Sequence, residues 1–132
     1  MKTNSTPARA TFVVYAKDIE RVAEFYRRTL NIAALEETSG FILLAGDGTE
    51  LSVVRIPDAL AETIAIVSPP VVRENTPMKV SFWLPSLSAV RDAATSTGGG
   101  LRPPETAWTW RGMLHIDGFD PEGNVVQFRS QA

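Results

Sequence analysis

The sequence contains no cysteine and a single histidine, His115, among its 132 residues. The absence of cysteine excludes disulfide bonds, thiol catalysis and cysteine-ligated zinc. One histidine excludes a metal site built from several histidines of the same chain. The glycine-rich phosphate loop and the GxSxG and HExxH patterns are also missing. The chain therefore offers none of the commonest catalytic motifs.

Long apolar runs and clusters of basic charge are missing as well. Thirteen Lys and Arg residues against fifteen Asp and Glu residues give a formal net charge of -2, and no basic patch of the kind that binds nucleic acid stands out. No stretch approaches the ~20 apolar residues of a membrane span, and the polar start does not resemble a signal peptide. We expect a cytoplasmic protein with neither nucleic acid nor a membrane as its partner.

What the chain has is the length and composition of one globular domain. With 132 residues, 44% of them hydrophobic and 21% charged, it can bury a sizeable core. We expect a single domain over residues 1–132. It would consist of a first module at residues 10–57, a linker at 58–76 and a second module at 77–130.

The first half of the chain predicts one helix among four strands. Residues 11–16 are β-branched and aromatic, which indicates a strand, and Asp18 is suited to cap a following amphipathic helix. Three further strands, separated by turns that contain glycine, are predicted at residues 32–36, 41–45 and 50–56. The predicted order is βαβββ.

The same order begins again in the second half. A strand at residues 80–84 precedes Ser86, which would cap a helix that ends at the glycines of residues 98–100, where glycine fits a left-handed conformation. Further strands are predicted at residues 101–102, 107–117 and 125–129.

The two halves superpose as an internal repeat. Aligning the two cap residues Asp18 and Ser86 brings Val14 onto Phe82. The glycine turns align independently, and this pairs Leu51 with Val126, Ser52 with Gln127, and Val53 with Phe128. In both alignments the alternation of hydrophobic and polar residues stays in step.

Two segments carry a resemblance to a known superfamily. They are Asp18–Ile19–Glu20 leading to Phe25–Tyr26, and Asp120–Pro121–Glu122–Gly123–Asn124 leading to Val126–Gln127–Phe128. Both resemble the vicinal oxygen chelate superfamily, which includes glyoxalase I, extradiol dioxygenases, and the fosfomycin and bleomycin resistance proteins. The resemblance implies an α+β fold of two βαβββ modules in tandem, with curved mixed sheets that enclose a cleft, helices outside, and a homodimer.

Period-two alternation assigns the strand residues to the two faces of these sheets. The residues expected to face the helices are Phe12, Val14, Leu51, Val53, Val80, Phe82, Val126 and Phe128. Those expected to face the cleft are Thr11, Val13, Tyr15, Glu50, Ser52, Lys79, Ser81, Trp83, Val125, Gln127 and Arg129. The cleft would therefore be largely polar.

The resemblance also implies where a metal would sit. In metal-dependent members the ligands, usually His, Glu or Gln, occupy four inward positions, which map onto Thr11, Ser52, Lys79 and Gln127. Only Gln127 is an ordinary ligand among these, with Glu50 as another if the register is off by two residues. A lysine ammonium among the donors repels a cation. We expect neither a metal nor another cofactor.

The candidate ligand-binding residues combine aromatic and charged side chains with the one histidine. They are Tyr15, Glu50, Ser52, Lys79, Trp83, Trp108, Trp110, His115, Gln127 and Arg129. His115 and Glu50 are the candidate catalytic groups. Alternatively, His115 is structural, the aromatic residues belong to the core, and Glu50 pairs with Lys79 or Arg129.

Two functions fit these residues. The first is a glyoxalase/bleomycin-resistance-like protein that binds a small aromatic or charged molecule in the cleft without a metal. The alternative is a metal-independent lyase, isomerase or glyoxalase-like enzyme with His115 and Glu50 as acid and base, an idea that rests on fold analogy. A vestigial cleft in a protein that acts through its surfaces is the third possibility.

Overall fold

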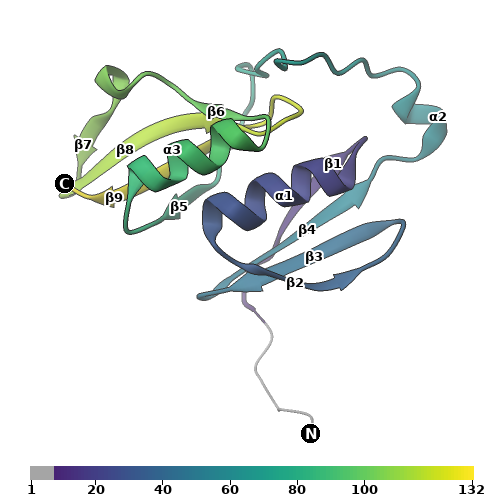
Figure 1. Ribbon diagram of the computed structural model, residues 1–132, viewed down its shortest axis with the longest axis horizontal. Coiled ribbons are helices and arrows are strands. Elements are labelled where there is room, and N and C mark those ends of the chain that lie inside the picture. The colour runs from purple at the N-terminus through teal and green to yellow at the C-terminus, as the bar shows by residue number, and fades with distance from the viewer. Residues whose placement is uncertain (1–7) are drawn as a thin grey trace, which may run out of the picture.

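Two mixed sheets, each with a helix on one face, make up the computed structural model, which describes residues 8–132 (Figure 1). The first sheet has the order β1-β4-β3-β2, with β1 parallel to β4. Its elements and helix are β1 (Phe12–Ala16), α1 (Ile19–Leu30), β2 (Ala33–Glu37), β3 (Phe41–Gly46) and β4 (Thr49–Arg55).

The second sheet has the order β5-β9-β8-β6, and β7 pairs with β8. Its elements and helix are β5 (Ser81–Trp83), α3 (Leu87–Ser96), β6 (Gly100–Leu101), β7 (Trp108–Trp110), β8 (Met113–Phe119) and β9 (Val125–Gln131). A short helix, α2 (Asp58–Ala61), follows β4, and a 3-10 turn, η1 (Pro104–Thr106), precedes β7. The expected α+β fold is confirmed.

Both helices begin at the predicted caps. The Asp18 carboxylate accepts a hydrogen bond from the backbone N–H of Arg21, and the Ser86 hydroxyl accepts one from Ala89. These bonds satisfy backbone donors that have no partner inside the helix. Gly98 follows α3 with φ of 94°, the left-handed conformation that the glycine run predicted.

The prediction of one strand over residues 107–117 is wrong, because this segment forms the hairpin of β7 and β8. The chain reverses at Arg111 and Gly112, whose φ angles are 53° and 76°. A glycine in second place favours such a two-residue turn. The alternating tryptophans hid the turn, because they continue the period-two pattern up to it.

The pairing of the strands confirms the internal repeat. Val13 pairs with Ser52 in the first sheet, and Ser81 pairs with Gln127 in the second. The sequence alignment had matched Ser52 to Gln127, and its other register matches Val13 to Ser81. The two halves therefore share one backbone plan, with equivalent residues at equivalent places in the two sheets.

One hydrophobic core lies between the sheets and their helices and joins both halves. It contains buried side chains of both halves, and Phe25 and Phe128 are fully buried in it. The helices α1 and α3 pack side by side (Figure 1). Phe12 of β1 meets Phe82 of β5 edge to face, with ring centroids 5.7 Å apart. The side chains predicted on the helix-facing side of the strands are buried in this core or packed against it.

The turn between β8 and β9 connects the second half to the first. The Tyr26 hydroxyl on α1 donates a hydrogen bond of 2.8 Å to the buried Asp120 carboxylate. The Glu122 carboxylate accepts bonds of 3.0 and 2.9 Å from the backbone N–H groups of Lys17 and Asp18. The motif that carried the family resemblance is therefore also a polar contact between the two halves.

The hydroxyl of Tyr26 makes stability depend on pH in the alkaline range. Burial, followed by the charge of Asp120 and their hydrogen bond, raises the pKa of Tyr26 well above its usual value. The unfolded chain therefore releases this proton first, at about pH 10, so the contribution of Tyr26 is complete below that pH and is lost as pH rises above it.

Replacing Tyr26 with phenylalanine should remove this dependence. At neutral pH the variant should lose about 1 kcal/mol of the free energy of unfolding, the value of one hydrogen bond. Between about pH 9.5 and 11 the wild-type protein should lose stability more steeply, by up to about 1.4 kcal/mol per pH unit. Urea unfolding at a series of pH values measures both, and parallel curves would contradict the assignment.

No helix within residues 8–132 is long and apolar enough to cross a membrane.

Candidate functional site

The face of the second sheet opposite α3 carries an aligned row of four side chains. Trp83 pairs with Arg129, Arg129 with His115, and His115 with Trp108. Directly paired residues on neighbouring strands point to the same face. The row therefore runs from β5 across β9 and β8 to β7, with a tryptophan at each end and Arg129 and His115 between them. We call it the aromatic row.

The tryptophans of this face are open to solvent. Trp83 is 46% exposed, Trp108 is 41% exposed, and Trp110, also on β7, is 60% exposed. Single exposed apolar residues are common, but large aromatic side chains gathered on one face are typical of binding surfaces. The alternative in which these residues form the core is wrong, because the core lies on the other face.

His115 is buried between two tryptophans. Its ring stacks on Trp108 with centroids 5.5 Å apart and meets Trp110 edge to face at 5.8 Å. Its Nδ1 lies 3.1 Å from the carbonyl oxygen of Met113. Because a carbonyl only accepts, Nδ1 carries the proton, and in the neutral ring Nε2 is the acceptor. Nε2 forms no hydrogen bond with residues 8–132.

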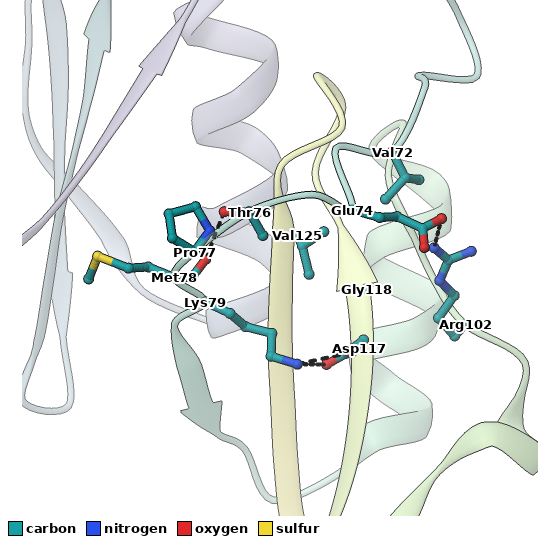
Figure 2. A pocket seen from close by; sticks show the side chains of 10 residues that line it. All are labelled: Val72, Glu74, Thr76, Pro77, Met78, Lys79, Arg102, Asp117, Gly118 and Val125. Carbon is teal, nitrogen blue, oxygen red and sulfur yellow. Dashed lines mark hydrogen bonds and ion pairs between the residues drawn. The ribbon is translucent and has the colours of Figure 1, made fainter.

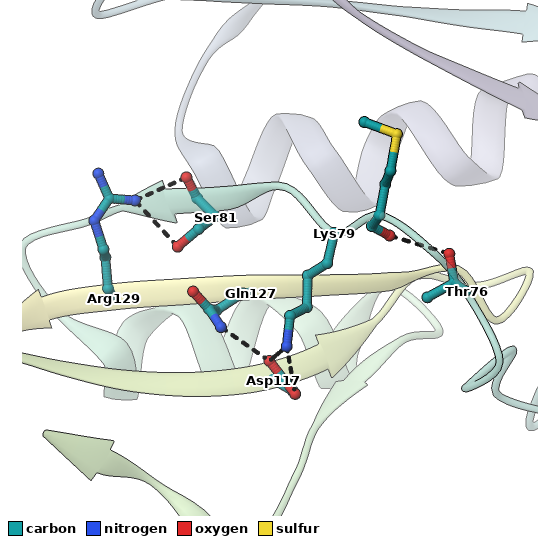
Figure 3. A network of polar contacts seen from close by, with 7 residues as sticks. Thr76, Lys79, Ser81, Asp117, Gln127 and Arg129 are labelled. Carbon is teal, nitrogen blue, oxygen red and sulfur yellow. Dashed lines mark hydrogen bonds and ion pairs between the residues drawn. The ribbon is translucent and has the colours of Figure 1, made fainter. Parts of the chain in front are cut away.

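Lys79, Asp117 and Gln127 form a polar network beside the aromatic row (Figure 3). The Lys79 ammonium lies 3.1 Å from both carboxylate oxygens of Asp117, and the Gln127 amide donates a bond of 3.4 Å to the same carboxylate. The ammonium also lies 5.8 Å from the centre of the Trp108 ring. This network connects β9 and β8 with the segment that precedes β5.

The alternative in which Glu50 pairs with Lys79 or Arg129 is wrong. Lys79 meets the carboxylate of Asp117, and the ion pairs formed within residues 8–132 do not include Glu50. The sequence did hold a signal for Asp117. It stands two residues after His115, so both side chains must point to the same face of β8. If residues 107–117 formed one strand, Asp117 would lie at its end, whereas in the structure it lies inside β8.

Arg129 is held by its neighbour on β5 and not by an acid. Its Nη1 donates hydrogen bonds of 2.7 Å to the Ser81 carbonyl oxygen and 3.1 Å to the Ser81 hydroxyl (Figure 3). The ion pairs formed within residues 8–132 do not include Arg129. The half-buried guanidinium therefore keeps an unbalanced positive charge on this face.

The equivalent face of the first sheet has a different character. It carries Val13 and Tyr15, which are 50% and 63% exposed, and the half-buried Glu50 and Ser52. Three of the ten predicted binding residues, Tyr15, Glu50 and Ser52, lie on the first sheet. The other seven lie on or beside the second. The contacts of His115 do not include Glu50, so the structure does not bring the two candidate catalytic groups together.

Two hollows border these faces. A groove of about 850 Å³ runs between β1 and β5 and includes Tyr15, Lys79 and Ser81 in its lining. A second hollow of about 440 Å³ has the Lys79–Asp117 pair on one wall and an ion pair of 2.7 Å between Arg102 and Glu74 on another (Figure 2). The segment before β5 lines both hollows.

The four positions at which metal-dependent members of the superfamily hold their ion do not fit a divalent cation here. Thr11, Ser52, Lys79 and Gln127 supply two hydroxyls, one ammonium and one amide, whereas such ions need about three or four anionic or strongly donating ligands. Within residues 8–132 no group of three or more His, Asp or Glu side chains gathers as such a site.

Comparison with protein-family models gives no match, and comparison with curated proteins gives none either. Solved structures do match over most of the chain. A glyoxalase/bleomycin resistance protein/dioxygenase family enzyme from Burkholderia phytofirmans PsJN has a TM-score of 0.68 at 14% identity, covering 92% of this chain and 97% of its own.

Two other matches have similar values. A genomically encoded fosfomycin resistance protein, FosX, from Listeria monocytogenes has a TM-score of 0.66 at 11% identity, covering 97% of this chain and 96% of its own. A glyoxalase-related enzyme from Fulvimarina pelagi has a TM-score of 0.63 at 16% identity, covering 93% and 88%. At such identities the likeness shows a shared fold.

Proposed function

We propose that this chain, which has the fold of the vicinal oxygen chelate superfamily, binds a small flat molecule on the open face of its second sheet without a metal. The aromatic row carries the proposal. Its two end tryptophans offer exposed rings on which a flat molecule can stack, and the charged and polar groups between them can fix its orientation.

Binding is favoured over catalysis because the candidate acid and base lie apart. A general acid and base must both reach the same bound substrate, whereas His115 is buried between tryptophans of the second sheet and Glu50 lies on the first. A lyase or isomerase activity that uses this pair therefore has no supporting contact.

The homodimer implied by the superfamily is a further proposal. The exposed side chains of Val13 and Tyr15 support it, and the molar mass of the protein in solution, measured by light scattering, tests it.

The affinity for the ligand should depend on the tryptophans and should not change when a chelator is added. For a flat aromatic ligand, Trp83→Ala and Trp108→Ala should each weaken binding about 5- to 30-fold, because a lost stacking contact is worth about 1–2 kcal/mol. Isothermal titration calorimetry, performed with and without EDTA, measures both effects.

Leu35 provides a matched control on β2 of the first sheet. Its side chain is 64% exposed, so Leu35→Ala removes an exposed apolar group away from the aromatic row. Its affinity should equal that of the wild-type protein. Unchanged affinity in both tryptophan variants would refute the site, and loss of binding in EDTA would refute metal independence.

A further inference from the structure

We infer that the ligand is a flat aromatic carboxylate and that Arg129 binds its carboxylate group. This inference rests on the proposed function, because it names the chemical class of the molecule that the aromatic row would hold. Three observations support it: the free edge of the guanidinium, the charge balance of the face, and the neighbours of Arg129 in the row.

The guanidinium of Arg129 has one edge in use and another edge free. Both of its hydrogen bonds, to the carbonyl and hydroxyl oxygens of Ser81, come from Nη1. Nε and Nη2 form no hydrogen bond with residues 8–132. These two nitrogens present parallel N–H groups, which match the two oxygens of a carboxylate. Ser81 therefore holds the side chain while the edge suited to a carboxylate stays available.

The charges on this face favour an anionic ligand. Lys79 is matched by Asp117, whereas Arg129 has no acidic partner within residues 8–132. A partly buried charge without a partner is unfavourable, and a ligand anion would relieve that cost. A cationic ligand would instead be repelled. Arg111, whose guanidinium lies 5.4 Å from the centre of the Trp110 ring, also has no acidic partner within residues 8–132. The face is therefore positively charged and suited to an anion.

The neighbours of Arg129 determine what should be attached to the carboxylate. Trp83 lies beside it on β5, and His115 lies beside it on β8, with Trp108 beyond. Cross-strand partners have Cβ atoms about 4.5–5.5 Å apart, so a ring joined directly to the carboxylate reaches the Trp83 indole on one side or His115 on the other. Trp108 lies one strand further, where an extended flat ring system can meet it. The Nε2 atom of His115 can accept a hydrogen bond from a hydroxyl on that ring.

Three probes that share a naphthalene ring and differ in charge test the inference. They are 2-naphthoate, the neutral 2-naphthamide and the cation 2-naphthylmethylammonium, titrated by calorimetry in EDTA. The wild-type protein should bind the carboxylate at least about tenfold more tightly than the amide, since hydrogen bonds to charged groups are worth about 1.5–3 kcal/mol. The ammonium compound should bind most weakly. Of the three affinities, only that for the carboxylate should fall when salt is added.

Variants of Arg129 separate its charge from its shape. Arg129→Gln should bind the carboxylate and the amide with equal affinity, and Arg129→Lys should recover only part of the preference, because an ammonium cannot form the paired contact. Arg28→Gln, which removes an exposed arginine on α1, is the control and should keep the full preference. Urea unfolding of each variant checks that the fold is retained.

The possible outcomes separate this inference from the proposed function. Equal binding of the three probes by the wild-type protein, with affinity still dependent on Trp83 and Trp108, would overturn the carboxylate assignment and leave the binding surface intact. A preference that persists in a folded Arg129→Gln variant would overturn the role of Arg129. Failure of all three probes to bind at millimolar concentration would overturn both proposals.

Discussion

Replacing Asp120 with alanine should lower the free energy of unfolding by about 2–4 kcal/mol, because it leaves buried donors without a partner. The Asp120 carboxylate accepts hydrogen bonds from the Tyr26 hydroxyl, from the backbone N–H groups of Glu122 and Asn124, and from the Asn124 amide. Burial nevertheless raises the pKa of Asp120 above its usual value, despite the opposing effect of these donors. The charged carboxylate is thus costly to bury, and its removal in Asp120→Ala offsets part of the lost free energy of unfolding.

Urea unfolding of Asp120→Ala at neutral pH measures this effect. Asp92→Ala is the control, because Asp92 is exposed on α3 and a surface substitution should change stability by less than about 0.5 kcal/mol. An equal, small change in both variants would show that the contact between Asp120 and α1 does not stabilise the junction of the two halves. A lower denaturant slope in Asp120→Ala would indicate that the halves unfold separately.

Replacing Gly123 with alanine should destabilise the protein by a similar amount, about 2–4 kcal/mol. Two physical causes add. Gly123 has φ of 88°, which disfavours any residue with a Cβ atom, and an added Cβ would clash with the carbonyl oxygen of Val71. The segment that contains Val71 would have to move, which endangers the bond of 2.8 Å between the Arg73 N–H and the Gly123 carbonyl.

Gly48→Ala separates these two causes. Gly48 has φ of 77°, and an added Cβ there would meet no atom within 4 Å. It should therefore show only the conformational effect, about 1–2 kcal/mol. If thermal or urea unfolding shows that both variants lose the same free energy of unfolding, the close approach of Val71 does not contribute to the effect of Gly123→Ala. A larger loss in Gly123→Ala would show that the turn holds the segment that lines both hollows.

Much of the fold could be predicted because local signals and the repeat agree. Asp18 and Ser86 are residue types that cap helices, and Gly98 is the type that ends them. Alternation placed Val53 and Phe128 in the core, and the strand pairing bears this out. Each of these features depends on residues close together in sequence, which is why the sequence alone could indicate them.

The site was harder to predict because it depends on pairing between distant strands. The alternation of Trp108 and Trp110 was correct, but the turn at Arg111 and Gly112 was missed, and with it the stacking of Trp108 on His115. The choice between Asp117 and Glu50 as the partner of Lys79 depends on how β8 and β9 align. Composition and periodicity do not contain that alignment.

The shared register of the two sheets gives the molecule an internal reference. At the places where the second sheet has Trp83, Arg129 and His115 in one row, the first sheet has the row Tyr15, Val54 and Phe41. The register of these three strands is the same, whereas β6 and β7 of the second sheet pair with β8 where β2 alone pairs with β3 in the first. Within these three strands, a difference in recognition between the two faces can thus be attributed to side-chain chemistry, and the first sheet is a template onto which part of a second recognition surface could be engineered.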